Sequence, residues 1–369
     1  MKKKMLKNME WWILICSIIL LIIGMCALFS ATKDSGYEEL KKQAIWSAIS
    51  LVIMVVLICI DYDLIAKASP ILYGIFIIAL IAVLFTKPIN GARSWFQITE
   101  TISFQPSEFA KIITIIFLST VIVRLQGRDK REINKIWKLA VVLLTIGVPM
   151  GLIVLQPDLG TVTAFAVALC FMLFASGIDK KYIIVAFVIV VVSIPLLYFF
   201  LLPAHAKTRI DVFLNPNLDP RGSGYNIIQS KLAIGSGQLF GMGILKGNQT
   251  QLGFLYPKTT DFIYSVIGEE MGFAVAAAVI ICYVALITKA VFIAKTARDD
   301  VGSYIAIGIA GIFTFHMVEN IGMTMGLLPI TGVPLPFVSY GGSSLITNFA
   351  CIGLLLNISA RRQKSLFID

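Results

Sequence analysis

Charged side chains are scarce in this sequence of 369 residues. Asp, Glu, Lys and Arg make up 14% of it and hydrophobic residues make up 58%, whereas a soluble domain is roughly 25% charged and roughly 45–50% apolar. The composition therefore excludes a soluble globular domain and predicts an integral membrane protein. Because a helix satisfies its backbone hydrogen bonds internally, the expected fold class is an all-α polytopic membrane protein.

Histidine is rare, and cysteine is absent from the polar segments. The two histidines form no zinc-protease motif, and all six cysteines fall inside apolar runs. This pattern excludes a disulfide framework and a thiolate metal cluster. Acidic residues are fewer than basic ones, and the net charge is +10. In a membrane protein such an excess marks cytoplasmic loops, so we expect no nucleic-acid partner.

Long apolar runs are abundant. A helix needs about 20 residues to cross a bilayer, and the runs predict about ten transmembrane helices in a single membrane domain, residues 1–369. We interpret the first run, which follows a basic start, as a retained helix and not as a cleaved signal. The expected helices cover 11–30, 44–60, 70–86, 107–123, 139–155, 160–177, 182–202, 262–288, 302–327 and 341–360.

Basic residues of the short loops set the expected orientation. They favour a cytoplasmic location for both termini. A long loop, residues 203–261, then lies outside between the seventh and eighth helices, and its apolar and polar residues alternate as in interfacial helical segments. Two more outer segments, 86–111 and 328–344, mix Gly, Pro and aromatic residues. Irregular backbone at membrane depth needs protein or a water-filled cavity around it, so these three segments are expected to roof a cavity open to the outer face.

Three carboxylates stand at the edge of the eighth helix, in "KTTDFIYSVIGEEMGF". Asp261 has two interpretations, which can coexist: an N-cap of the helix, or a partly desolvated general base. Glu269 and Glu270 are adjacent, so their side chains point in different directions. One of them is expected to face a polar cavity or a basic partner, with a structural ion pair as the alternative.

Further polar residues lie inside or beside predicted spans. Glu108 and Lys111 are three residues apart on one helix and are expected to pair. They are either a structural pair or a lining of the cavity in which Lys111 offers charge to a phosphate. Asp158, in "QPDLGT", is a candidate cap of the sixth span. Trp95 is either an interfacial aromatic or a platform for stacking a sugar. Ser343, in "SYGGSS", is placed at the cavity with them.

His316, Glu319 and Asn320 share a face of the ninth span. They predict an internal hydrogen-bonded brace, with a proton relay as the alternative. The glycines of "GSGQLFGMG" do not have the spacing of a nucleotide loop, and we interpret them as flexible turns.

The outer loop is net basic, and Arg209 and Lys258 are among its cations. It can hold anionic lipid headgroups or a pyrophosphate, and composition does not choose between these.

Six stretches, taken together and in order, resemble the SEDS family (shape, elongation, division and sporulation proteins). Within the family they are more similar to the elongation members, RodA, than to the division members, FtsW. The stretches are "NGARSWFQI", "FQPSEFAKI", "QPDLGT", "GYNIIQSKLAIGSGQLFGMG", "TDFIYSVIGEEMGF" and "GLLPITGVPLPFVSYGGSSL", which span about residues 90 to 350.

The resemblance implies a peptidoglycan glycosyltransferase of the bacterial cytoplasmic membrane that polymerises lipid II at the outer face. It implies that Asp261 is essential and that Trp95 is functionally important. The implied partners are a class B penicillin-binding protein, which is a transpeptidase, and other elongation-complex proteins. The competing functions are a lipid II flippase and a scaffold for wall synthesis.

A mechanism follows as a hypothesis. Asp261 acts as general base in one inverting transfer, and the departing pyrophosphate needs counter-charge from outer-loop Lys and Arg or from a divalent cation, Mg or Mn. Apart from this divalent cation, the sequence indicates no cofactor. Membrane lipids surround the protein.

Overall fold

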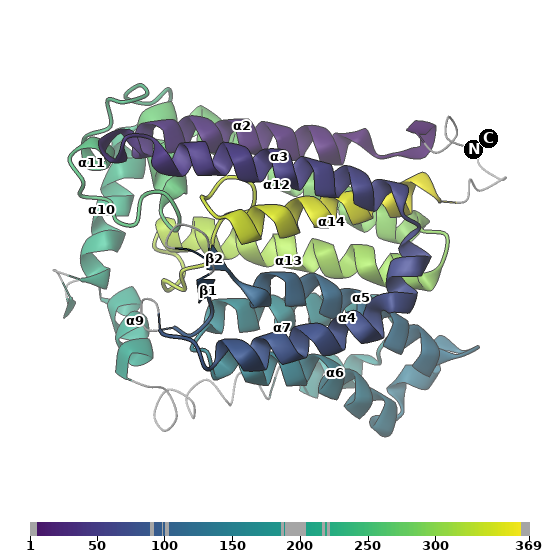
Figure 1. Ribbon diagram of the computed structural model, residues 1–369. Coiled ribbons are helices and arrows are strands. Elements are labelled where there is room, and N and C mark those ends of the chain that lie inside the picture. The colour runs from purple at the N-terminus through teal and green to yellow at the C-terminus, as the bar shows by residue number, and fades with distance from the viewer. Residues whose placement is uncertain are drawn as a thin grey trace.

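The structure is a bundle of long helices that run side by side (Figure 1). This computed structural model describes residues 6–88, 92–97, 99, 103–185, 188, 204–215, 218–219 and 222–362. The long helices are α2 (Trp11–Ala31), α3 (Glu38–Cys59), α4 (Tyr62–Val83), α5 (Pro106–Gln126), α6 (Ile136–Val154), α7 (Leu159–Ala175), α12 (Ile263–Thr296), α13 (Asp300–Thr324) and α14 (Gly342–Ala360).

Short elements connect the long helices. A two-stranded antiparallel hairpin pairs β1 (Phe96–Gln97) with β2 (Ser103–Phe104). The segment between α7 and α12 includes α9 (Ala204–Leu214), α10 (Ser223–Ser236) and α11 (Asn248–Gln251). Two 3₁₀ turns, η1 (Lys33–Ser35) and η2 (Lys130–Asn134), follow α2 and α5.

The prediction of an all-helical, multi-span protein is confirmed. Seven of the described helices are long and apolar enough to cross a membrane, and these are α2, α3, α4, α6, α12, α13 and α14. Helices α5 and α7 coincide with two further predicted spans. The span expected at 182–202 lies largely outside the described residues.

Helix α4 begins earlier than the sequence predicted, at Tyr62 and not near residue 70. Asp61 caps it by accepting a hydrogen bond from the Asp63 amide, and Pro70 lies inside the helix. A proline inside a helix frees the carbonyl four residues earlier. That carbonyl, of Ala66, accepts the Ser69 hydroxyl at 2.7 Å. The local side chain therefore repairs the interruption, and the helix continues through the proline.

A second internal proline is repaired by a neighbouring helix. Pro149 lies inside α6, which frees the carbonyl of Thr145. The hydroxyl of Tyr73, on α4, donates to that carbonyl at 2.7 Å. This bond joins α4 to α6 at membrane depth, where an unsatisfied carbonyl would cost several kcal/mol.

Helices α13 and α14 form the interior of the bundle. In the most apolar 18-residue stretch of each helix, 89% of the residues are buried in α14 and 67% in α13. In α3, α4 and α6 the buried share is 17–22%. Two glycines let neighbours approach α13 closely. A methyl group on Gly308 would lie 2.8 Å from Ile115 of α5, and one on Gly311 would lie 2.9 Å from Ala168 of α7.

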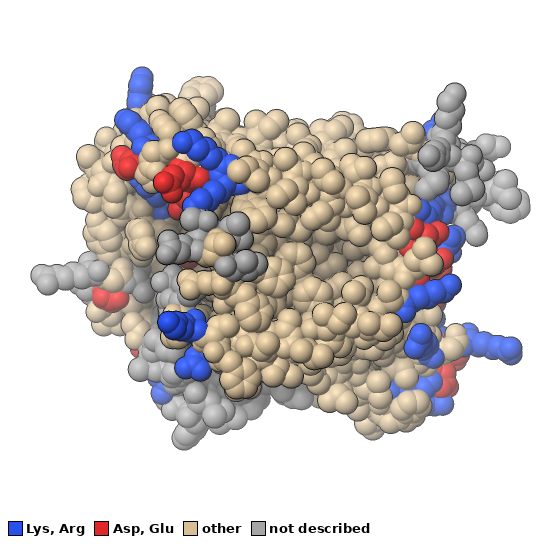
Figure 2. Space-filling model, in the orientation of Figure 1, with Lys and Arg blue, Asp and Glu red and all other residues tan. Residues whose placement is uncertain are grey.

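Both termini lie at one end of the bundle (Figure 1). Figure 2 shows a broad uncharged band between two ends at which charged side chains gather. At the terminal end, Glu10 precedes α2 and pairs with Arg362, just after α14, at 2.7 Å and with Lys289 of α12 at 3.4 Å. These pairs join the first and last helices to α12.

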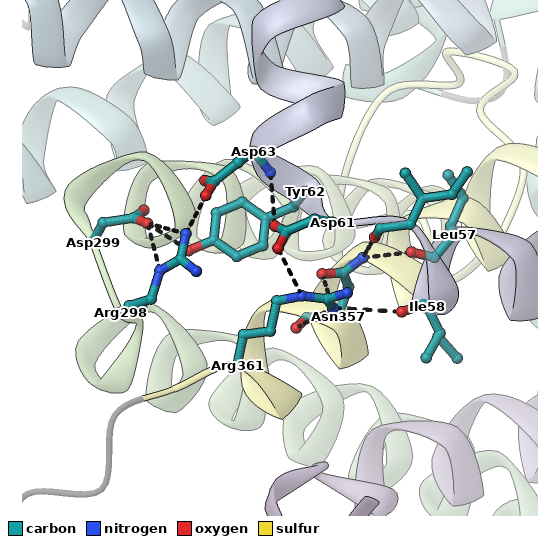
Figure 3. Close-up of polar contacts among 10 residues, drawn as sticks. Leu57, Ile58, Asp61, Tyr62, Asp63, Arg298, Asp299, Asn357 and Arg361 are labelled. Carbon is teal, nitrogen blue, oxygen red and sulfur yellow. Dashed lines mark hydrogen bonds and ion pairs between the residues drawn. The ribbon is translucent and has the colours of Figure 1, made fainter. Parts of the chain in front are cut away.

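The same end carries a second set of ion pairs, which we call the terminal-end clamp and which comprises Asp61, Tyr62, Asp63, Arg298, Asp299, Asn357 and Arg361 (Figure 3). Arg298, in the turn between α12 and α13, pairs with Asp63 of α4 and with Asp299. The Tyr62 hydroxyl donates to Asp299 at 2.6 Å. The start of α4 is thereby joined to the α12–α13 turn.

The other half of the clamp holds the end of α3. Arg361, next to α14, pairs with Asp61 at 3.3 Å. The amide of Asn357 donates to the carbonyl of Leu57 (Figure 3) and to that of Ile60. These are among the last carbonyls of α3 and its C-cap, which have no partner within their own helix.

Candidate active site

Asp261 lies at the end of the bundle opposite the termini, immediately before α12. Helix α12 begins at Ile263, and its N-cap is Phe262, with no side-chain cap. The interpretation of Asp261 as the helix cap is therefore wrong. The residue is half-buried. Its carboxylate approaches Gly332, where a methyl group would lie 3.5 Å from Oδ2 of Asp261.

Asn320 holds the backbone of Asp261 from one side. Its amide nitrogen donates to the carbonyl of Asp261 at 3.0 Å and to that of Val333 at 2.8 Å. Asn320 is fully buried on α13. One side chain therefore ties the residue before α12 to the segment that precedes α14.

The other two polar residues on this face of α13 hold the same segment. Glu319 accepts the Thr331 hydroxyl at 2.8 Å, and Nδ1 of His316 lies 3.0 Å from the carbonyl of Pro334. The prediction of a hydrogen-bonded brace is confirmed for these residues.

The residues before α14 hold the two residues that precede Asp261. The Ser339 hydroxyl donates to the carbonyl of Thr260 at 2.7 Å, and the Tyr340 amide donates to that of Thr259 at 2.9 Å. Gln43 of α3 donates to the Ser339 carbonyl at 3.1 Å. The backbone that leads into Asp261 is therefore fixed by two separate parts of the chain.

Glu108 and Lys111 form the predicted pair. Their side chains are 5% and 4% exposed, and the ammonium lies 2.8 Å from the carboxylate. Thr347 of α14 donates to the other oxygen of Glu108 at 3.2 Å. Nε2 of His316 lies 3.2 Å from the Lys111 ammonium. Because His316 also contacts Pro334, this buried pair is joined to the segment beside Asp261.

Asp158 caps α7, as the sequence predicted. It accepts the amide of Thr161 at 3.0 Å and its hydroxyl at 2.8 Å. Burial raises the pKa of the Asp158 carboxyl above its ordinary value. Gln105 donates from its side chain to Asp158 at 3.3 Å, and its backbone amide donates to the hydroxyl of Ser343 at 3.2 Å. Asp158 and Ser343 are therefore joined through one residue.

The remaining predicted residues are Trp95, Lys258 and Arg209. Trp95 is half-buried beside β1, next to Ser94, whose hydroxyl donates to the Gln156 carbonyl at 3.5 Å. Lys258 pairs with Asp34 at 3.2 Å and donates to the carbonyl of Thr250 at 3.0 Å. Arg209 lies in α9, but its side chain is outside the described part of the structure.

Helix α12 is broken at Gly272, a feature that sequence reasoning missed. Gly272 has φ 79° and ψ −179°, which is not helical and is strained for residues other than glycine. The freed groups bond to residues 238–243. Phe273 and Ala274 donate to the carbonyls of Gln238 and Leu239 at 2.8 and 3.1 Å, and Met242 and Gly243 donate to those of Glu269 and Glu270 at 2.9 and 3.0 Å.

The glycines of "GSGQLFGMG" allow this insertion. A methyl group on Gly237 would lie 1.8 Å from the carbonyl oxygen of Gly268, and one on Gly241 would lie 2.2 Å from that of Glu270. Both distances are far below van der Waals contact. The glycines after α10 lie in turns, as the sequence predicted, and Gly237 and Gly241 let these turns bond into the break of α12.

Glu269 and Glu270 lie just before the break, where they are 0% and 1% exposed. Glu269 accepts the amides of Gln249 and Thr250 at 2.7 and 3.0 Å and the Thr250 hydroxyl at 2.7 Å. Glu270 accepts the amides of Leu245 and Gly247 at 3.2 and 3.3 Å and the side chain of Gln251 at 3.0 Å. In these bonds the partners are amides and a hydroxyl, and not the expected basic residue.

Comparison with known proteins decides the family. Residues 7–364 match the model of the FtsW, RodA and SpoVE proteins, described as cell cycle proteins. This chain belongs to the FtsW/RodA/SpoVE family. The peptidoglycan glycosyltransferase MrdB of Escherichia coli (strain K12) is 40% identical over 352 residues, which cover 95% of this chain and 93% of MrdB. Stage V sporulation protein E of Bacillus subtilis is 34% identical, with 94% and 96% covered.

Solved structures agree with this assignment. A chain in a peptidoglycan synthase complex, described in terms of polymerisation and crosslinking, superposes with a TM-score of 0.83 at 27% identity, covering 97% of this chain and 99% of that one. The rod shape determining protein RodA of Thermus thermophilus superposes with a TM-score of 0.72 at 26% identity, covering 97% and 98%. The multi-span helical architecture is therefore that of the FtsW/RodA/SpoVE family.

Proposed function

We propose that this chain is a peptidoglycan glycosyltransferase that polymerises lipid II into glycan strands, with Asp261 as general base. The activity is that named for the relative MrdB. The observation that supports the role of Asp261 is its setting. Its backbone is held by Asn320 and lies next to residues held by Ser339 and Tyr340, while its carboxylate lies beside a residue without a side chain, Gly332.

The proposed reaction is a single displacement. The Asp261 carboxylate takes the proton from an acceptor sugar hydroxyl as that oxygen forms a bond to the anomeric carbon of the donor. The bond from the anomeric carbon to the pyrophosphate breaks on the opposite face, and the electron pair leaves with the pyrophosphate. Configuration is therefore inverted. A positioned general base typically contributes about 10²–10⁴-fold to the rate.

The leaving pyrophosphate needs positive charge near it. Arg209 and Lys258 are the proposed sources, together with Lys111 at the buried pair; in this structure Lys258 is bound to Asp34. Trp95, Asp158 and Ser343 are proposed to line the sugar side of the cavity. A divalent cation, Mg²⁺ or Mn²⁺, would supply the same counter-charge, although among the described residues no three His, Cys, Asp or Glu side chains gather as ligands.

An apolar groove offers a place for the polyprenyl tail of the substrate. It has a volume of about 460 Å³ and is lined by α3, α4, α5 and α14. Leu57 and Leu72 line its two walls, and Phe109, next to Glu108, is also part of it. A tail in this groove stays in an apolar environment, while its head group reaches the polar residues at the start of α5.

We further propose that the enzyme acts in cell elongation and works with a class B penicillin-binding protein. The elongation role is supported by the 40% identity to MrdB and by 32% identity to RodA of Treponema pallidum. The partner is supported by the superposition on a peptidoglycan synthase complex. The proposed location is the bacterial cytoplasmic membrane, with Asp261 at the outer face.

The test is polymerisation of labelled lipid II by the purified protein with its penicillin-binding partner, read on a glycan-strand gel with and without chelator. Asp261→Asn is expected to lose about 10²-fold or more of the rate, because amide nitrogen cannot accept the proton. Asp179→Asn is the matched control, since the Asp179 side chain is 48% exposed and forms a surface ion pair with Lys181 at 3.2 Å.

Full polymerisation by Asp261→Asn would remove that residue from the mechanism. If the wild-type protein does not polymerise but moves lipid II across liposomes, the chain is a transporter. If it does neither and still binds its partner, the chain is a scaffold.

A further inference from the structure

The first half of α12, residues 263–271, is a separate short helix with Asp261 two residues before it. This short helix is joined to the second half of α12 through Gly272, whose φ of 79° and ψ of −179° interrupt the helix. Because Gly272 is not helical, the second half of α12 does not by itself set the direction of the first half. The direction of residues 263–271, and with it the position of Asp261, must therefore be set by other contacts.

Apolar packing of Ile263, Val266 and Ile267 in the core supplies some of those contacts. The hydrogen bonds at the end of this segment come from residues 238–251, which we call the bracing loop. Four backbone hydrogen bonds of 2.8 to 3.1 Å join the loop to the two ends of the break. The carboxylates of Glu269 and Glu270 add six further bonds of 2.7 to 3.3 Å. Bonds that a charged carboxylate accepts are about twice as strong as neutral ones, so these two side chains dominate the attachment.

The bracing loop is in turn attached to α2. The hydroxyl of Ser30 accepts the Leu245 amide at 3.2 Å and the side chain of Gln251 at 2.8 Å. Gln251 also donates to Glu270. A continuous set of bonds thus leads from α2 through the loop to the first half of α12.

Neither carboxylate is arranged to meet a substrate. Both are buried, and all four of their oxygens accept bonds from the bracing loop. Among the described residues, neither forms an ion pair with Lys or Arg. Burying a charge is costly unless it is well hydrogen-bonded, so two adjacent carboxylates in this place require a structural gain of comparable size.

We propose that Glu269 and Glu270 are positioning residues that hold the first half of α12 and thereby place the Asp261 carboxylate for proton transfer. This inference rests on the proposed function. A displacement of about 1 Å at a reacting group can cost about 10²-fold in rate. The two glutamates act through the helix and do not contact lipid II.

The direct test measures the rate of polymerisation by Glu269→Gln and Glu270→Gln with the penicillin-binding partner present. Each change puts an NH₂ group against backbone amides that need an acceptor. We expect kcat to fall about 10- to 100-fold while KM for lipid II stays within about twofold, because the groups that bind substrate are unchanged. The control is Glu38→Gln, since Glu38 is 72% exposed at the start of α3.

A milder pair of variants covers the case in which the glutamine variants do not fold. Thr250→Val removes only the hydroxyl that donates to Glu269, and Thr250→Ser keeps it. We expect a lower kcat in the valine variant and a smaller loss in the serine variant. Hydrogen exchange of the amides of residues 245–251 is expected to be faster in every variant that loses activity.

Two results would overturn the inference. One is wild-type kcat in Glu269→Gln, or in Thr250→Val, together with faster exchange in the bracing loop. The other is a raised KM at unchanged kcat, which would place the carboxylates in substrate binding. A wild-type protein without polymerisation would instead overturn the proposed function itself, so the two failures are distinguishable.

Discussion

At the scale of the residue, Asn320 shows how one buried side chain joins two segments of the site. Its NH₂ group donates to Asp261 and to Val333, which are distant from each other in the sequence. Both acceptors are backbone carbonyls, so the bonds do not depend on the identity of the side chains there. His316 likewise contacts a backbone carbonyl, that of Pro334, whereas Glu319 accepts a hydrogen bond from the side-chain hydroxyl of Thr331. A single face of α13 therefore fixes the segments next to Asp261.

Replacing Asn320 by Asp tests this arrangement. Aspartate has nearly the same shape but brings a carboxylate against two carbonyls, leaving buried acceptors unsatisfied at about 1–3 kcal/mol each. We expect a lower melting temperature in detergent and about a tenfold or greater loss of polymerisation. Asn215→Asp, at an exposed position just after α9, is the control. Wild-type stability and activity in Asn320→Asp would show that the two bonds are unimportant.

Helices α3 and α4 depend on different neighbours, although they are consecutive in the sequence. Helix α3 packs chiefly on α14 and α4 on α5, and the apolar groove lies between them. The turn that joins them is held by the terminal-end clamp through Asp61 and Asp63 (Figure 3). The clamp therefore fixes one end of the groove without filling it.

The clamp can be measured by a double-mutant cycle with Arg298→Gln and Asp63→Asn. The two side chains are 31% and 39% exposed, so solvent screens them and we expect a coupling of about 0.5–1 kcal/mol in the free energy of unfolding. Raising the salt concentration should reduce it. The pair of Lys130 and Asp300, at 58% and 44% exposure, is the control and should couple less. Equal coupling in both pairs would argue against a special role for the clamp.

The whole molecule places its termini at one end and α10 and α11 at the other (Figure 1). Asp261 follows α11 in the chain and precedes α12. Basic loop residues predict that the terminal end is cytoplasmic. The test uses single cysteines labelled by a membrane-impermeant maleimide on intact cells. Tyr256→Cys is expected to react, because Tyr256 is 73% exposed at the Asp261 end, whereas Lys130→Cys should react only after lysis. The opposite pattern would invert the topology and remove the proposed access to lipid II.

Local patterns were predictable because they depend on spacing along the chain. The pairing of Glu108 with Lys111 follows from three-residue spacing on a helix, and the capping by Asp158 follows from its place before an apolar run. The break at Gly272 was missed because hydropathy continues across it. The only signal in the sequence was the glycine itself, together with the glycines of "GSGQLFGMG", whose partner lay some thirty residues away.

By itself, the sequence determined the membrane class, the approximate helices and the family, because hydrophobic runs and short motifs are properties of neighbouring residues. Tertiary structure alone decided that Asn320 bridges Asp261 and Val333, that Glu269 and Glu270 bind the bracing loop, and that the Tyr73 hydroxyl repairs the proline of α6. The bridge, the bracing loop and the Tyr73 repair join parts of the chain that meet only when the bundle closes. In the membrane interior an unpaired polar group is costly, and only the folded chain shows which partners these side chains have.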